Sequence, residues 1–234
     1  MIPLRDNIPS SITPVVSIAT IITCAIVFLW QLSLGEHGFQ AVVYSLGVVP
    51  ATLLRDARLP PDLYLIPPIA TVFTSMFLHG GWLHLIGNML FLWIFGDNVE
   101  DAMGHVRFLF FYLVCGAAAA LAQSLPNPES TVPMIGASGA ISGVLGAYLL
   151  LYPRAQVLVL IPLGLFTQLV HLPAMLVLGL WFAMQLISSL LAAPGSGGVA
   201  FGAHVGGFVV GMLLVFPFRR RGPPLFRRAR GRRS

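Results

Sequence analysis

Long apolar segments that lack charged side chains run through the whole chain. Of the 234 residues, 57% are hydrophobic and 9% are charged. Soluble domains carry about 25% charged residues, and a helix needs roughly 20 apolar residues to cross the hydrocarbon core of a bilayer. The sequence therefore predicts an all-α polytopic membrane protein, a bundle of about six transmembrane helices with little beside it.

Six membrane-spanning helices can be placed between prolines, glycines and charged residues. Their expected ranges are residues 14–34, 82–95, 106–125, 137–152, 172–191 and 202–218. The expected organisation is a cytoplasmic N-terminus at 1–13, a six-helix membrane domain at 14–218 and a basic cytoplasmic tail at 219–234.

Three stretches between the expected spans are different in character. Residues 35–74 are polar and contain proline, so we expect them to pack on the membrane surface. Residues 155–170 are apolar but are interrupted by Pro162 and Gly164, which indicates a partly interfacial segment. The acidic run at 97–101 is interpreted as a solvated loop rather than a functional cluster.

Arginine distribution predicts the orientation of the chain. All 13 basic residues are arginine, and eight of them follow Phe218. A basic tail can also bind nucleic acid, but directly after a span it more often sets topology and contacts anionic lipid. With an even number of spans, both termini are expected in the cytoplasm. The lysine-free, arginine-rich composition further indicates a bacterial inner-membrane protein.

A serine and a histidine open two of the expected spans. Ser138 begins the fourth, in a Gly-Ala-Ser-Gly sequence, and His204 begins the sixth. Both are expected toward the outer face, and an ionisable side chain within a bilayer indicates function. Serine is a weak nucleophile unless a base takes its proton, which histidine can do. Because no acidic residue falls in the middle of a span, the pair predicts hydrolysis by a Ser–His dyad.

Small residues recur beside both of these polar groups. On the fourth span they include Gly146, and on the sixth Ala203. The glycines that we expect to serve helix packing are Gly136, Gly139, Gly143, Gly207 and Gly211. Small residues at such spacing let helices approach closely in lipid. If these faces meet, Ser138 and His204 come within reach; alternatively, the stripes only pack the bundle and the two polar residues are incidental.

A third group of polar residues leads into the second span. His84 and Asn88 are four residues apart and therefore share a helix face. Their N–H groups, with the backbone N–H of Ser138, could stabilise an oxyanion, or they could only bond neighbouring carbonyls. A zinc site is the rival interpretation, but His79 and His84 are five apart and no His-Glu-x-x-His is present. We expect no metal and no other cofactor.

The ordered set of these motifs resembles the rhomboid intramembrane serine proteases. It consists of His84-x-x-x-Asn88, Gly136-x-Ser138-Gly139 and Ala203-His204-x-Gly206-Gly207, within residues 74–216. The resemblance implies a six-helix core with a water-filled cavity, Ser138 as nucleophile and His204 as general base. It also implies an oxyanion hole that includes His84 and Asn88. The expected partners are membrane lipid and single-span membrane proteins, cleaved in or near their transmembrane segment without metal or ATP.

The resemblance implies a gate for substrate, and the chain departs from the family pattern beside the nucleophile. In such enzymes the fifth helix and the following loop, here 172–191 and 193–201, are proposed to admit substrate. Some members place an aromatic residue one turn after the nucleophile, where this chain has Ser142, so another group must orient His204.

Two function classes remain open from the sequence. The first is an intramembrane serine endopeptidase. The second is a catalytically inactive rhomboid-like protein that binds membrane helices for trafficking or quality control, although inactive relatives usually lose the serine or the histidine. A transporter would be expected to carry paired ionisable residues within its spans, and these spans show none apart from the histidines.

Overall fold

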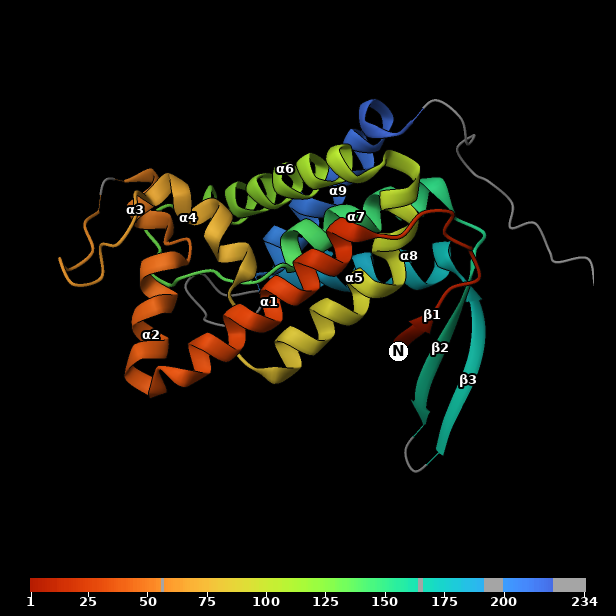
Figure 1. Ribbon diagram of the computed structural model, residues 1–234, viewed down its shortest axis with the longest axis horizontal. Helices are drawn as coiled ribbons and strands as arrows, with labels where there is room; N and C mark the ends of the chain where they lie inside the picture. Colours follow the sequence, from red (N-terminus) through yellow and green to blue (C-terminus); the bar gives the residue numbers. More distant parts are fainter. Residues whose placement is uncertain (56, 164–165, 192–199, 221–234) are drawn as a thin grey trace, which may run out of the picture.

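The computed structural model describes residues 1–55, 57–163, 166–191 and 200–220, which form a helical bundle with one small sheet (Figure 1). Most of the expected tail (219–234) and of the expected gating loop (193–201) lies outside these ranges. The helices are α1 Val15–Ser33, α2 Gly35–Leu46, α3 Pro50–Leu54, α4 Pro68–Thr74, η1 Ser75–Phe77, α5 Trp82–Met103, α6 His105–Ser124, α7 Ser138–Leu151, α8 Ala174–Leu191 and α9 Phe201–Phe218. The strands are β1 Ile2–Arg5, β2 Gln156–Leu163 and β3 Phe166–Pro173.

Helix α7 lies at the centre of the bundle, against α5, α6 and α9 (Figure 1). Its residues from Gly139 to Tyr148 are all buried. At 14 residues it is about 21 Å long, which is shorter than the roughly 30 Å hydrocarbon core of a bilayer. The central helix is therefore too short to cross a membrane from one surface to the other.

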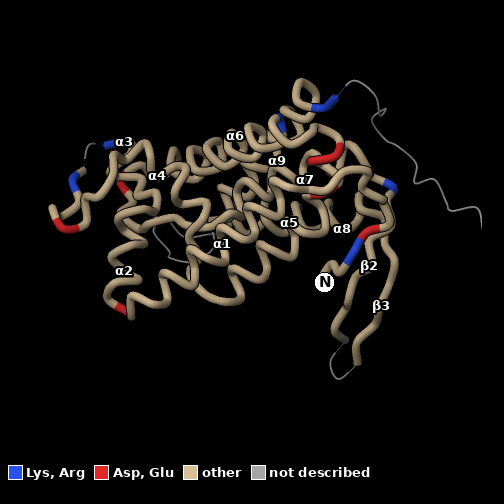
Figure 2. Tube along the Cα trace, in the orientation of Figure 1, with Lys and Arg blue, Asp and Glu red and all other residues tan. Residues whose placement is uncertain are grey.

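Among the described residues, the charged ones gather toward the two ends of the longest axis, and the middle of the bundle carries few of them (Figure 2). Among the described helices, α1, α6, α8 and α9 are each long and apolar enough to cross a membrane. A fifth span results if α4 and η1 are joined to α5, across a bend of 82°. This organisation is that of a multi-pass membrane protein.

Large apolar side chains are exposed on the outer helices. On α1, Ile26 is 62% exposed, and on α8 Ile187 and Leu190 are 56% and 77% exposed. Such surfaces would be unfavourable in water, whereas hydrocarbon solvates them. The bundle is thus apolar outside as well as inside, as expected for helices in lipid.

The predicted spans at 14–34, 106–125 and 202–218 coincide with α1, α6 and α9 to within one residue at each end. The second span differs, because α5 continues through the acidic run to Met103. The interpretation of that run as a solvated loop is wrong.

Glu100 explains why the acidic run is helical. It is fully buried, and its carboxylate accepts the N–H groups of Val16 at 2.9 Å and Ser17 at 2.8 Å. These N–H groups belong to the first turn of α1, where the helix dipole favours a negative charge. His105 Nδ1 lies 2.6 Å from the same carboxylate. The run therefore joins the end of α5 to the beginning of α1.

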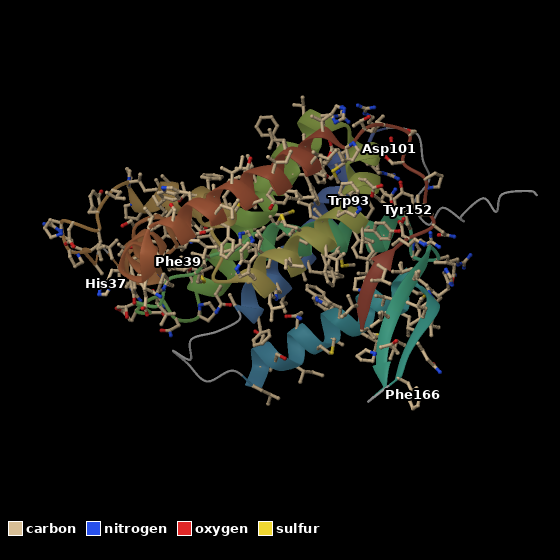
Figure 3. All side chains as sticks on the ribbon, turned by 60° about the horizontal axis from the view of Figure 1, so that its bottom comes forward. His37, Phe39, Trp93, Asp101, Tyr152 and Phe166 are labelled. Carbon is tan, nitrogen blue, oxygen red and sulfur yellow. The ribbon has the colours of Figure 1, made fainter. Side chains whose placement is uncertain are left out.

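A three-stranded antiparallel sheet, in the order β1-β2-β3, corrects the expectation of an all-α fold. The stretch thought to be interfacial forms β2 and most of β3, and the N-terminal residues pair with β2. Val157 and Val159 of β2 are fully buried, at the two-residue period of a strand with one covered face. The sheet projects from one end of the bundle, with Phe166 far from the helices (Figures 1 and 3).

Candidate active site

The first turn of α5 holds His84 in a defined tautomer. The backbone N–H of Gly80 donates to His84 Nδ1 at 3.3 Å, so the proton of the neutral ring is on Nε2. The ring of His79 lies edge-on at 5.1 Å between centroids. A Cβ atom placed on Gly136 would lie 2.6 Å from His84 Nε2. The Nε2–H group is therefore presented to the backbone just before α7.

Asn88, one turn further along α5, presents a second donor to the same backbone. Its side chain is 8% exposed, and its Nδ2 has no hydrogen-bond partner within the described chain. A Cβ on Gly136 would lie 3.7 Å from this atom. Gly136 has φ of +122°, a conformation open to glycine. Glycine is thus required here by its backbone angle and by the space that His84 occupies.

Ser138 is the first residue of α7 and is partly buried. The N–H groups in the first turn of a helix have no intrahelical acceptor, so the backbone at Ser138 presents donors toward the same region as His84 and Asn88. The hydroxyl of Ser142, one turn later, donates to the carbonyl of Ser138 at 2.6 Å. Ser142 therefore satisfies backbone within α7 and is committed to that helix.

His204 lies in the first turn of α9 and is 8% exposed. Its Nδ1 is 2.7 Å from Oε1 of Gln185 on α8. Its ring centroid lies 5.8 Å from that of Trp181, also on α8, at an interplanar angle of 33°. The start of α9 is anchored to α6, where Gln123 Oε1 accepts the N–H of Ala203 at 3.1 Å.

Glycines bring α7 and α9 into backbone contact. A Cβ on Gly207 would collide with the carbonyl of Gly139, and one on Gly211 would collide with the carbonyl of Gly143. On the α6 side, a Cβ on Gly143 would lie 2.6 Å from Cys115 Sγ. Any larger residue would push these helices apart and would separate the first turn of α7 from that of α9.

One cavity of about 1140 Å³ is lined by Ser138, His204, His84 and Asn88. These residues come from the first two turns of three different helices. In the described structure no hydrogen bond joins the Ser138 hydroxyl to His204. The cavity therefore collects a hydroxyl, an imidazole and two N–H donors, which together can perform acyl transfer.

The sequence interpretation missed Gln185 and Trp181. The available signal was modest: Gln185 is the only amide side chain in the expected span 172–191, and Trp181 stands four residues before it on the same face. Among the described residues, no group of three His, Cys, Asp or Glu side chains could hold a metal ion.

Comparison with known proteins matches residues 68–221 to the model of the Rhomboid domain. The chain is 28% identical to rhomboid-like protein 11, chloroplastic, of Arabidopsis thaliana, over 76% of this chain and 64% of that protein. It is 31% identical to rhomboid protein 1, mitochondrial, of Saccharomyces cerevisiae, over 75% of this chain and 50% of that protein.

A shorter match is to the rhomboid protease GluP of Bacillus subtilis, 44% identical over 33% of this chain and 15% of that protein. The chain thus spans at most 64% of the length of these three relatives. The matched domain covers most of the residues that line the cavity and the helices from α4 to α9, and the chain belongs to the rhomboid family.

Proposed function

We propose that this chain is an intramembrane serine endopeptidase that cleaves single-span membrane proteins in or near their transmembrane helix. The observation that carries the proposal is the single cavity shared by Ser138, His204, His84 and Asn88. Membership of a family that includes proteins named as proteases supports it. The mechanism uses no metal and no other cofactor.

In the first step, the Nε2 lone pair of His204 takes the proton of the Ser138 hydroxyl while Oγ attacks the carbonyl carbon of the scissile peptide. The described structure has no hydrogen bond between Ser138 and His204, and catalytic hydrogen bonds often form or shorten only when substrate binds. The product of this step is a tetrahedral oxyanion covalently bound to Ser138.

The oxyanion is stabilised by donors that already surround Gly136. His84 Nε2–H, Asn88 Nδ2–H and the backbone N–H of Ser138 supply three hydrogen bonds in a low-dielectric site. The protonated His204 then gives its proton to the leaving amine, and the peptide bond breaks. Water, deprotonated by the same imidazole, hydrolyses the acyl-enzyme and regenerates the serine.

We place the cavity toward the outer face of the membrane and both termini in the cytoplasm, with six spans. Ser130 and Met134 line the cavity and belong to the loop between α6 and α7, which lies away from the end of the bundle that carries the sheet (Figure 1). The short α7 would be the sixth membrane-embedded helix, and because it is shorter than the bilayer it would begin below the outer surface. The arginine-rich C-terminus supports this orientation.

Labelling with a fluorophosphonate probe tests the nucleophile directly. Ser138 Oγ would displace fluoride from phosphorus, and mass spectrometry would identify the modified peptide. We expect wild type to be labelled at Ser138, Ser138→Ala to be unlabelled and His204→Ala to react much more slowly. Absence of label on folded wild type would favour the alternative, an inactive rhomboid-like protein that binds membrane helices.

A further inference from the structure

We infer that Gln185 is a positioning residue for the proposed protease: it fixes the tautomer and orientation of His204 from helix α8. The inference rests on the proposed function, because it concerns the base of that reaction. It assigns to an amide in an outer helix the part that a buried carboxylate plays in soluble serine proteases.

The contact itself determines which nitrogen carries the proton. Gln185 Oε1 lies 2.7 Å from His204 Nδ1, and a carbonyl oxygen can only accept a hydrogen bond. The neutral ring must therefore hold its proton on Nδ1, which leaves Nε2 as the acceptor. Nε2 is the nitrogen that must take the serine proton.

Two contacts from the same face of α8 orient the ring. Trp181 lies beside the face of the imidazole with centroids 5.8 Å apart, and Gln185, four residues later, binds its edge. One contact restrains the tilt of the ring and the other restrains rotation in its plane. Together they supply the orientation that α7 does not, because the Ser142 hydroxyl is bonded within its own helix.

Charged groups do not compete for this role in the described part of the cavity. The lining includes no Asp, Glu, Lys or Arg, and the only other titratable ring that faces it is His84. Gln123, a glutamine of the lining, has its Oε1 bonded to the N–H of Ala203. Gln185 is thus the hydrogen-bond acceptor that the structure provides for His204.

This arrangement makes the base depend on the position of α8. Helix α8 is the least buried of the four long apolar helices, with 17% of its residues inside the bundle. It is held against α9 by the His204 contacts and by the stack of Phe182 on Phe208 at 4.5 Å. A displacement of α8 from α9 would break the hydrogen bond, so His204 is oriented only while α8 is closed on the bundle.

The test measures the rate of fluorophosphonate labelling against pH for Gln185→Leu and Gln185→Glu. Gln185→Leu removes the hydrogen-bond acceptor of His204, whose ring becomes charged in the transition state. This loss should slow labelling about 10- to 100-fold. Gln185→Glu keeps an acceptor oxygen and should recover most of the rate. Its acid limb should lie at higher pH than that of Gln185→Leu, because a carboxyl oxygen stabilises the protonated imidazole better than a methyl group does.

Gln168→Leu is the matched control, since it makes the same substitution on an exposed side chain of β3, and it should label at the wild-type rate. ¹⁵N NMR of labelled histidines gives a readout independent of activity. In wild type the His204 signals should show a proton on Nδ1, and in Gln185→Leu they should show a mixture of tautomers.

The outcomes separate the two proposals. If wild type labels at Ser138 while Gln185→Leu labels equally fast with an unchanged pH profile, the role of Gln185 is overturned and the protease remains. If wild type does not label, the protease proposal fails. In that case, an unchanged His204 tautomer in Gln185→Leu would also show that Gln185 does not fix the tautomer. A changed tautomer would show that it does.

Discussion

The side chain of Asn88 is buried beside Gly136, and its Nδ2 has no partner within the described chain. A buried donor without an acceptor destabilises a folded protein by about 1–3 kcal/mol. Asn98, nearly three turns further along α5, differs because its Nδ2 donates to the carbonyl of Ile8 at 3.1 Å. Under the proposed function the two asparagines of α5 therefore differ: the Nδ2 of Asn88 is available to an oxyanion, whereas the Nδ2 of Asn98 binds the backbone.

Asn88→Ala should lower the cleavage rate while leaving the melting temperature close to wild type. Removal of one oxyanion donor typically slows reaction by about 100- to 1000-fold, and the remaining donors place the expected loss at the lower end. Asn98→Ala should show the reverse, a lower melting temperature with normal turnover by the folded protein. Equal loss of stability in both variants would contradict the role of Asn88.

Asp6 is a partly buried carboxyl outside the membrane-spanning helices. Burial raises its pKa from 3.8 to about 6, although the hydroxyl of Tyr148, which donates to its carboxylate, opposes the shift. The folded chain therefore binds more protons at Asp6 than the unfolded chain does between these two pH values. By linkage, the contribution of this group to the free energy of unfolding falls as the pH rises through that range.

Asp6→Asn should remove this part of the pH dependence. The amide cannot ionise, yet its oxygen can still accept the Tyr148 hydroxyl. Between about pH 4 and pH 6 the melting temperature of wild type should decline relative to that of the variant. Parallel curves for the two proteins across this range would show that Asp6 is not the group responsible.

The sequence predicted four residues that line the cavity, but it did not predict which side chains contact His204. Ser138, His204, His84 and Asn88 stand out because polar groups are expensive in an apolar segment. Gln185 is equally polar, but its value depends on the rotation of α8 relative to α9. No local sequence pattern in either helix specifies that rotation. The contact between Gln185 and His204 is therefore visible only in the three-dimensional structure.

At the scale of helices, the contact between α7 and α9 is made by backbone. A Cβ atom on Gly211 would collide with the carbonyl of Gly143. This contact between α7 and α9 lies two turns along α9 from His204. Gly179 on α8 offers a comparison, because a Cβ there meets nothing within 4 Å. The same substitution at these two glycines therefore isolates interhelical packing from helix propensity.

Gly211→Ala should lower stability, since overpacking typically destabilises a protein by about 1–3 kcal/mol. Gly179→Ala should be neutral or should stabilise the helix by up to about 1 kcal/mol. The midpoint of thermal unfolding in detergent distinguishes the two. Equal midpoints for the two variants would be incompatible with backbone contact between α7 and α9.

The sequence predicted the helix boundaries correctly where an apolar segment long enough to cross a bilayer ended at polar residues, as in α1, α6 and α9. The end of α5 did not, because the buried Glu100 has partners on α1 that are more than 80 residues away. The hairpin of β2 and β3 was also missed. Its apolar residues are compatible with an interfacial segment as well as with a strand. Its pairing with β1 joins residues far apart in the sequence, so no local pattern predicts it.

At the scale of the whole molecule, charge at both ends and lipid-facing apolar helices define how the bundle sits in a membrane (Figure 2). The cavity lies at the end opposite the sheet, where the short α7 begins. In the proposed reaction, water would reach the partly buried Ser138 hydroxyl from the cavity, and the substrate helix would reach it from the lipid. This placement connects the fold to the proposed reaction, since both substrates of hydrolysis must meet at Ser138.

The most direct test of the central claim is cleavage of a single-span model substrate in detergent by wild type and Ser138→Ala, with a metal chelator present throughout. We expect wild type to produce two fragments separated within or near the transmembrane segment, and Ser138→Ala, equally well folded, to produce none. Cleavage by Ser138→Ala at the wild-type rate would contradict the assignment of Ser138 as nucleophile.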